Sequence, residues 1–295
     1  MSSFQAGILP GVPRSARYLS FNLQTDTDSA SARALLEEIQ VDQDLVIGLG
    51  EPLIASWGSS INELRSFPAM SGPGVQVPST QRALWCWLRG ENLGDLVHRS
   101  NALCDSLQPA FRVEQIEDGF KYGSEELGKD LTGYEDGTEN PTGDDALAAA
   151  FVSGAGAGLD GSSFVAVQQW VHDLRHFSSL PQSEQDHIIG RKLSDNTEIG
   201  DAPESAHVKR TEQESFEPHA HILRRSMPFA GSCGEGLVFV AFGRTFDAFE
   251  VQMRRMAGLD DGIADALFRF SRPINGAYYW CPPVAGNQLD LSALD

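Results

Sequence analysis

Positive charge is scarce in this chain. Among its 295 residues, 41 aspartates and glutamates outnumber 22 lysines and arginines, which gives a formal net charge of −19. A negative balance of this size argues against binding to nucleic acid or to an anionic membrane through general electrostatics. We expect the protein to attract cationic or neutral substrates rather than anionic ones.

Long apolar runs and paired cysteines are also missing. No stretch is apolar enough to span a bilayer, and residues 1–11 lack the basic start and apolar run of a signal peptide. The four cysteines have no Cys-x-x-Cys spacing, which excludes a zinc ribbon and a c-type haem attachment site. We therefore expect a cytoplasmic protein whose thiols are reduced and mostly buried.

Apolar periodicity divides the first half of the chain into strands and helices. We predict strands at residues 16–23, 44–49, 81–89, 111–116 and 120–122, with a turn at residues 117–119. We predict helices at residues 31–39 and 93–107, and an irregular segment at residues 51–79. The resulting order, βαββαβ, is that of a ferredoxin-like unit.

The second half repeats this order after a small-residue linker at residues 146–161. We predict strands at 163–172, 237–242 and 275–281, extended segments at 207–210 and 221–224, and helices at 183–189, 245–256 and 263–270. The expected fold class is α+β, with antiparallel sheets and peripheral helices. We predict two tandem ferredoxin-like units, residues 1–145 and residues 146–295, that pack into one body.

A polar stretch near the middle of the chain has the composition of a tight loop. Residues 133–141 read Gly-Tyr-Glu-Asp-Gly-Thr-Glu-Asn-Pro. The two glycines permit positive φ angles and close backbone approach, and Pro141 ends any regular element. Such a string is typical of an acidic surface turn. It is also typical of a loop that presents one carboxylate, that of Asp136, to a pocket.

The pattern Gly-x-x-Asp-Gly, continued by Thr-Glu-Asn-Pro, resembles the signature of the dye-decolourising peroxidases. These are haem enzymes of the dimeric α+β-barrel type. Two further segments match the order and gaps of the B-type members. Ile-Gly-Arg at residues 189–191 precedes His207, and Leu-Arg-Arg-Ser-Met-Pro at residues 223–228 follows it. Together these segments extend the resemblance over nearly the whole chain.

The resemblance implies roles for individual residues. His207 would be the axial iron ligand of one haem b per chain, and Asp265 would accept a hydrogen bond from its other ring nitrogen. Asp136 and Arg224 would lie on the opposite face of the haem as the catalytic pair. Ser226 stands where many relatives carry Asn, and its hydroxyl would hold a water on that face.

The chemistry of peroxide explains why such a pair suits the reaction. One oxygen of hydrogen peroxide must lose a proton, and the other must gain one to leave as water. A carboxylate within hydrogen-bond reach can do both. A fixed guanidinium stabilises the developing negative charge and lowers the pKa of the carboxylate. We therefore expect an acidic pH optimum.

Other residues allow two interpretations. Glu139 and Arg191 would line the haem edge or its propionates, or would be structural salt-bridge partners. We interpret Arg225 as a solvated charge. The aromatic residues of the strands are expected in the core, and one or two of them would relay electrons from bulky substrates; they are Trp85, Trp87, Trp170, Tyr278, Tyr279 and Trp280.

The function implied by the resemblance is that of a haem-dependent peroxidase. It would reduce hydrogen peroxide and oxidise dyes, phenolics or Mn(II), as small-molecule reductants, through a ferryl intermediate. Two alternatives stay open: a porphyrin- or haem-handling protein that oxidises porphyrinogens or releases haem iron, and a haemless barrel used for binding or assembly.

Two kinds of partner also follow from the resemblance. Relatives form dimers or larger homo-oligomers, and some are packed into encapsulin shells through a C-terminal tail. Leu-Asp-Leu-Ser at residues 289–292 is a candidate for such a tail. A plain disordered end is the simpler expectation for this segment.

Overall fold

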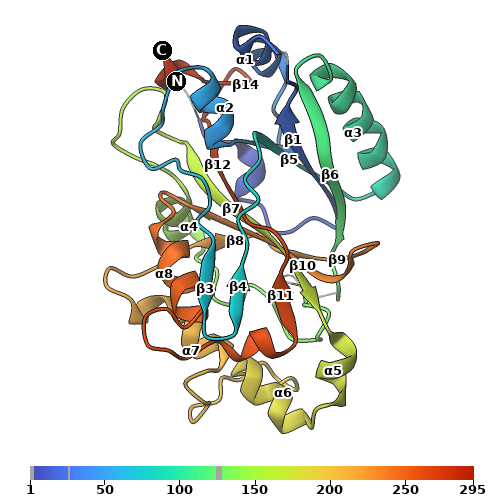
Figure 1. The fold of residues 1–295 in the computed structure, drawn as a ribbon, viewed down its shortest axis with the longest axis vertical. Helices are drawn as coiled ribbons and strands as arrows, with labels where there is room; N and C mark the ends of the chain where they lie inside the picture. Colours follow the sequence, from blue (N-terminus) through green and yellow to red (C-terminus); the bar gives the residue numbers. More distant parts are fainter. Residues whose placement is uncertain (1–2, 26, 124–127) are drawn as a thin grey trace.

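The computed structural model describes residues 3–25, 27–123 and 128–295, and a β-barrel is its main feature (Figure 1). One sheet has the strand order β11-β7-β12-β2-β5-β1-β6-β9-β10-β8, and a further pairing of β7 with β10 closes eight strands into the barrel. These eight are β1 (Ser15–Leu23), β2 (Leu45–Leu49), β5 (Leu84–Gly90), β6 (Phe111–Phe120), β7 (Ser163–His172), β9 (Met227–Gly231), β10 (Gly234–Gly243) and β12 (Ala277–Cys281). Two short strands, β8 (Leu223–Arg224) and β11 (Ser271–Pro273), extend the sheet.

Each half of the chain contributes four neighbouring strands to the barrel. The first half gives β6-β1-β5-β2 and the second gives β12-β7-β10-β9. Numbered along the chain within each half, both sets run 4-1-3-2, and the pairs are antiparallel. This is the ferredoxin-like arrangement, so the predicted fold class is confirmed. The predicted boundary at residues 145 and 146 falls inside α4 (Gly143–Ala150), and division into two units at that point stays a prediction.

Large aromatic side chains fill the interior of the barrel. The rings of Tyr18, Trp85, Trp87 and Tyr279 stack with centroid separations of 6.0–6.4 Å. They face inward because alternate residues of a strand point to opposite faces of the sheet. The six aromatic residues predicted to be core are each at most 4% exposed, which confirms their placement.

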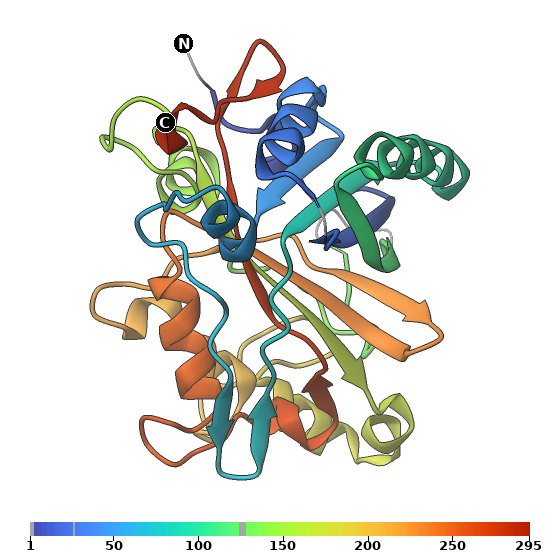
Figure 2. The same cartoon turned by 45° about the horizontal axis from the view of Figure 1, so that its top comes forward.

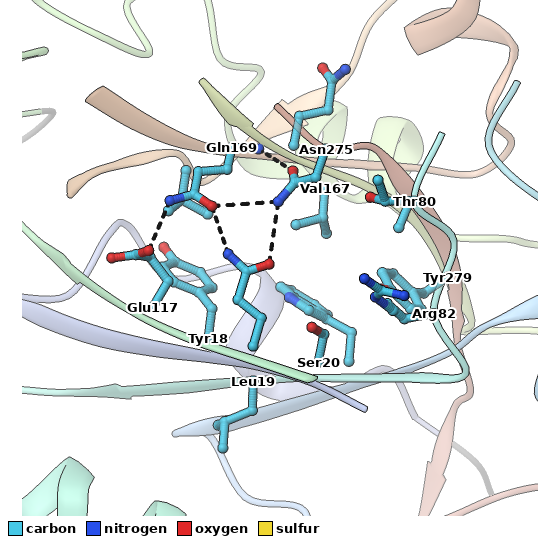
Figure 3. A pocket seen from close by; sticks show the side chains of 15 residues that line it. Tyr18, Leu19, Ser20, Thr80, Arg82, Glu117, Val167, Gln169, Asn275 and Tyr279 are labelled. Atoms are coloured by element: carbon cyan, nitrogen blue, oxygen red, sulfur yellow. Dashed lines mark hydrogen bonds between the residues drawn. The ribbon is translucent and has the colours of Figure 1, made fainter. Parts of the chain in front are cut away.

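A small polar cavity of about 50 Å³ remains beside these rings (Figure 3). The Gln169 side-chain amide donates to Glu117 at 2.8 Å, and that of Gln115 donates to Gln169 at 2.6 Å. Burial raises the pKa of the half-buried Glu117 carboxyl, although the bond from Gln169 acts in the opposite direction. The barrel interior therefore disfavours the ionised form of this carboxyl.

Helices cover the outside of the barrel on different sides of it (Figures 1 and 2). α3 (Leu93–Leu107) packs on β1 and β5 and contacts α1 (Ser29–Glu38). α8 (Asp247–Met256) packs on β10, and α7 (His207–Thr211) packs on α8. Two further helices, α5 (Leu174–Ser179) and α6 (Gln182–Ile189), follow β7. No helix among the described residues is long and apolar enough to cross a membrane.

A hairpin from the first half of the chain reaches the second half. It consists of β3 (Met70–Gly72) and β4 (Val75–Val77), and β4 contacts β11 (Figure 1). The tip passes directly over the end of α8, because a Cβ atom at Gly72 would lie 1.6 Å from the carbonyl oxygen of Ala257. Only glycine allows so close an approach between the two backbones.

Some local predictions are wrong. Residues 117–119 form no turn but continue β6, because β6 pairs with β1 along its whole length. The segment at residues 51–79 contains α2 (Glu51–Ser56) as well as the hairpin. Residues 207–210 are helical rather than extended, and residues 263–270 contain only the 3₁₀ helix Ala266–Arg269. The first residues of the expected linker belong to α4, whose alanines and first-turn aspartates favour a helix.

The C-terminal segment is packed on the body, and the expectation of a disordered end is wrong. The strands β13 (Val284–Ala285) and β14 (Gln288–Leu289) pair with each other, and a 3₁₀ helix, Ser292–Leu294, follows. Leu289 and Leu291 are both buried. Of the four cysteines, none is in a disulfide; Cys86 and Cys281 are buried, and Cys233 is exposed.

Candidate active site

A cavity of about 260 Å³ lies on the outer face of β7 and β10. Part of its wall is apolar and comes from the strands and α8, with Trp170, Phe239, Phe249 and Met253 among the lining residues. The polar part comes from the loop at residues 130–139, from α7 and from the segment around Arg224. Apolar walls with a few convergent polar groups are typical of a small-molecule or cofactor site.

His207 lines this cavity from the first position of α7. Its Nδ1 lies 2.7 Å from Oδ2 of Asp265, whose side chain is fully buried. The other Asp265 oxygen accepts the backbone N–H of Leu267 at 2.8 Å. A carboxylate held in this way fixes the proton of the imidazole on Nδ1 and leaves Nε2 as a free lone pair. The predicted pairing of His207 with Asp265 is thus present in the structure.

Asp136 and Arg224 meet at the cavity from two distant parts of the chain. Their side chains approach to 3.5 Å between Oδ1 and Nη1, and each is about one-fifth exposed. Asp136 follows the tight turn at Gly133 and precedes Gly137, and both glycines have positive φ angles, of 92° and 84°. The loop is therefore a shaped support for one carboxylate rather than a plain surface turn.

The glycine of the Ile-Gly-Arg segment, Gly190, allows α6 and α7 to approach each other closely. Gly190 ends α6 with a φ of 95°, and a Cβ atom there would lie 3.0 Å from Cβ of Val208. The missing side chain lets the end of α6 contact the start of α7, which carries His207. Arg191 lines the cavity, and its guanidinium lies 2.6 Å from Glu139 and 3.5 Å from Glu198.

Comparison with known proteins places this geometry in a family. A family model described as Dyp-type peroxidase, C-terminal, matches residues 128–286, which is more than half of the chain. The dye-decolorizing peroxidase of Mycolicibacterium paratuberculosis is 30% identical over 282 residues, covering 87% of this chain and 78% of the relative. This chain belongs to the Dyp-type peroxidase family.

Solved structures agree with this membership. A DypB variant from Rhodococcus jostii in complex with heme superposes with a TM-score of 0.84 at 26% identity, covering 95% of this chain and 96% of the other. A protein from Shewanella oneidensis, described as a putative dyp-type peroxidase, gives a TM-score of 0.83 at 27% identity, covering 96% and 97%. The resemblance to dye-decolourising peroxidases of the B type is confirmed.

Sequence reasoning did not identify one residue of this Dyp-type peroxidase that supports Arg224. The side chain of Asn140 bonds both backbone polar groups of Arg224: its Oδ1 accepts the Arg224 N–H at 2.7 Å, and its Nδ2 donates to the Arg224 carbonyl at 3.2 Å. The side-chain amide of Asn140 thus makes the two hydrogen bonds that a neighbouring strand would make to the backbone of Arg224. Its place in the Asp-Gly-Thr-Glu-Asn-Pro string is the signal that could have identified it.

Ser226 and Arg225 take positions that the sequence did not predict. Ser226 is buried, its hydroxyl accepts the backbone N–H of Val240 at 3.3 Å, and it is not among the described residues that line the cavity. The interpretation of Arg225 as a solvated charge is wrong. Its guanidinium is buried and donates to the carbonyls of Ile8, at 3.1 Å, and Leu9, and burial lowers its pKa to about 10.

The cavity of this Dyp-type peroxidase is acidic. Its lining contains two arginines, Arg191 and Arg224, against seven carboxylates: Asp130, Glu135, Asp136, Glu139, Glu198, Glu212 and Glu214. The local excess of negative charge has the same sign as the net charge of the chain. The field of the cavity and that of the whole protein therefore both favour the approach of small cations over that of small anions.

Proposed function

We propose that this Dyp-type peroxidase binds one haem b in the 260 Å³ cavity, where Nε2 of His207 would hold its iron. The donor set fits the group. A neutral imidazole suits haem iron, and a carboxylate on the opposite ring nitrogen makes it a stronger ligand. The single observation that carries this assignment is the 2.7 Å contact between His207 Nδ1 and the fully buried Asp265.

Haem-dependent peroxidase activity belongs to the family. When bound, haem would supply the redox chemistry, namely two-electron oxidation by peroxide and re-reduction by electrons from a reducing substrate. Asp136 would take the proton from one oxygen of hydrogen peroxide and deliver it to the other, which then leaves as water. Arg224, 3.5 Å from this carboxylate, would stabilise the negative charge that develops as the O–O bond breaks.

Arg191 and Glu139 act together in this proposal. Because the Arg191 guanidinium also donates to the carbonyl of Asn196 at 3.0 Å, the interpretation as structural salt-bridge partners is favoured. The pair would tie the segment after α6 to the loop that carries Asp136, at the wall of the haem cavity. Ser226 has no place in the mechanism that we propose, because it is not among the described residues that line the cavity.

The reducing substrates that we propose are neutral or cationic: dyes, phenolics or Mn(II). The acidic lining of the cavity supports this choice.

We further propose a cytoplasmic homo-oligomer, which light scattering after gel filtration would test. We do not extend the proposal to an encapsulin shell, because the two leucines of the candidate Leu-Asp-Leu-Ser tail, Leu289 and Leu291, are buried against the body.

The test of this proposal combines haem titration with rapid mixing. Replacement of His207 by Ala should abolish the Soret band of the haem-titrated protein, whereas His187→Ala, on the exposed face of α6, should not. Replacement of Asp136 by Ala or Arg224 by Leu should leave haem bound but slow the reaction with peroxide at least about 100-fold. Haem binding with unchanged peroxide kinetics in both variants would refute the mechanism. Release of iron from an intact porphyrin would indicate haem handling instead.

A further inference from the structure

A buried chain of hydrogen bonds lies beside the proposed catalytic loop and has no part in the mechanism so far. His172, the last residue of β7, has Nδ1 2.7 Å from the Ser271 hydroxyl and Nε2 3.1 Å from Oδ2 of Asp130. The His172 and Asp130 side chains are 4% and 16% exposed, and both residues line the same cavity as Asp136. An imidazole between a hydroxyl and a carboxylate is thus built into the cavity wall.

The direction of the hydrogen bond between His172 and Asp130 follows from the charge of Asp130. Burial disfavours its ionised form, but the bonds from His172 and Thr132 outweigh this and lower its pKa. An ionised carboxylate can only accept, so Nε2 of His172 carries the proton and donates to Asp130. Nδ1 of His172 forms the second bond of the imidazole, at 2.7 Å from the Ser271 hydroxyl.

Asp130 is also the centre around which the catalytic loop folds. Its Oδ1 accepts the Thr132 backbone N–H at 2.8 Å and the Thr132 hydroxyl at 2.5 Å. Its own N–H donates to the Tyr134 carbonyl at 2.9 Å, and its carbonyl accepts the N–H of Gly133 at 2.8 Å. Four hydrogen bonds of one residue therefore close the turn that leads into Asp136.

Ser271, at the other end of this chain of hydrogen bonds, is fixed to the barrel. Ser271 of β11 pairs directly with His172 of β7, and the ring of Phe270 packs on the His172 imidazole at a centroid distance of 5.6 Å. A strand of the closed barrel thus holds the imidazole. The imidazole in turn holds the catalytic loop through its hydrogen bond to Asp130. A loop on a rigid support can hold a carboxylate within the small tolerance that proton transfer demands.

We propose that Asp130 and His172 are positioning residues for Asp136, and that they act by hydrogen-bonding the catalytic loop to β7. This inference rests on the proposed function of Asp136. A positional error of about 1 Å at a catalytic group can reduce a rate about 100-fold. Loss of either partner should therefore slow the reaction with peroxide without displacing the haem.

The experiment compares variants that break the hydrogen bond with one that keeps it. Asp130→Ala and His172→Phe should reduce the rate constant with hydrogen peroxide by about 10- to 100-fold, with an unchanged Soret band and unchanged KM for the reducing substrate. Asp130→Asn should stay within about threefold of the parent, because the imidazole can move its proton to Nδ1 and accept from the new amide. A slow Asp130→Asn protein would show that the charge, not the bond, matters, and would overturn the inference.

A double-mutant cycle separates positioning from a general loss of stability. In an Asp136→Ala background, His172→Phe should have no further effect on the rate, because His172 acts only through Asp136. Equal effects of His172→Phe in both backgrounds would overturn the inference. Thr132→Val, which removes one donor to Asp130, gives a milder second variant if Asp130→Ala does not fold.

A measurement without haem provides an independent readout. In the apo-protein, hydrogen exchange of peptides from residues 128–137 should speed up in Asp130→Ala and stay at the parent rate in Asp130→Asn. Unchanged exchange in Asp130→Ala would refute the anchoring role. If Asp136→Ala itself reacts normally with peroxide, the proposed function fails and takes this inference with it. A slow Asp136→Ala with a normal Asp130→Ala overturns only the inference.

Discussion

Replacement of Asn140 by Ala removes the side chain that holds the backbone of Arg224. Two hydrogen bonds are lost, of 2.7 and 3.2 Å. The Arg224 carbonyl keeps a second donor, Nη1 of Arg225 at 2.9 Å, so the Arg224 N–H bears most of the loss. At a net value of about 1 kcal/mol for each bond, we expect the free energy of unfolding to fall by about 1–2 kcal/mol, and Tm by about 2–3 °C.

The same substitution should slow the reaction with peroxide. Arg224 sits on the two-residue strand β8, whose pairing with β10 covers only Leu223 and Arg224. Without Asn140, the guanidinium is less fixed relative to Asp136, and we expect the rate constant with hydrogen peroxide to fall about tenfold, which corresponds to about 1.4 kcal/mol of transition-state stabilisation. Thermal unfolding and stopped-flow spectroscopy of the haem-loaded protein measure the two effects.

Asn101→Ala serves as the matched control for Asn140→Ala. Asn101→Ala, on the exposed face of α3, should change the free energy of unfolding by less than about 0.5 kcal/mol and leave the rate unchanged. Asn140→Asp keeps the acceptor for the Arg224 N–H and should retain more of the rate than Asn140→Ala. An Asn140→Ala protein with lowered Tm but normal peroxide kinetics would refute the reasoning, because Arg224 would then be placed by other contacts.

Three other perturbations test separate parts of the structure. Asp265→Asn should weaken haem binding about 10- to 100-fold in titrations of the apo-protein, because an amide donor facing Nδ1 of His207 moves the ring proton to Nε2; equal affinity would contradict the assigned tautomer. Gly190→Ala should lower the free energy of unfolding by more than about 1 kcal/mol in denaturant titrations, since its φ of 95° and the 3.0 Å approach to Val208 both oppose a side chain. Glu117→Gln should raise Tm by about 1–2 °C at pH 8 and have no effect at pH 4. The pKa of Glu117 is raised in the folded protein, so the parent protein loses stability as the pH rises above 4.5, the ordinary pKa of a glutamate. A gain in Tm that persists at pH 4 would be inconsistent with this cause.

The sequence predicted the elements whose side chains repeat regularly. The apolar stripe of α3 gave its bounds at Leu93 and Leu107, and the strand at residues 163–172 coincides with β7. The predictions were wrong where hydrogen bonding to a distant strand decides the conformation. The Glu-Asp-Gly at residues 117–119 has the composition of a turn, but pairing with β1 and the salt bridge of Arg17 with Asp118, 3.1 Å long, keep it extended.

The candidate site shows the same division. The motifs identified Asp136, His207 and Arg224, and the structure brings all three to one cavity. The supports of these residues could not be read from local patterns. The Arg225 guanidinium bonds to the carbonyl of Ile8, more than 200 residues away, so its burial has no local signal. His172 is one strand residue among many until Asp130 and Ser271 are placed beside it.

The contact at Gly72 connects the first half of the chain to the side of the cavity that carries His207. The hairpin touches Ala257 at the end of α8, and the carbonyl of Met256, one residue earlier, accepts the backbone N–H of Asp265 at 2.8 Å. Asp265 in turn holds His207. A methyl group at Gly72 would therefore push on the support of His207, the proposed iron ligand, through Ala257, Met256 and Asp265. The proposed iron ligand, His207, lies in the second half of the chain, yet this contact lets the folding of the first half influence how firmly His207 is held.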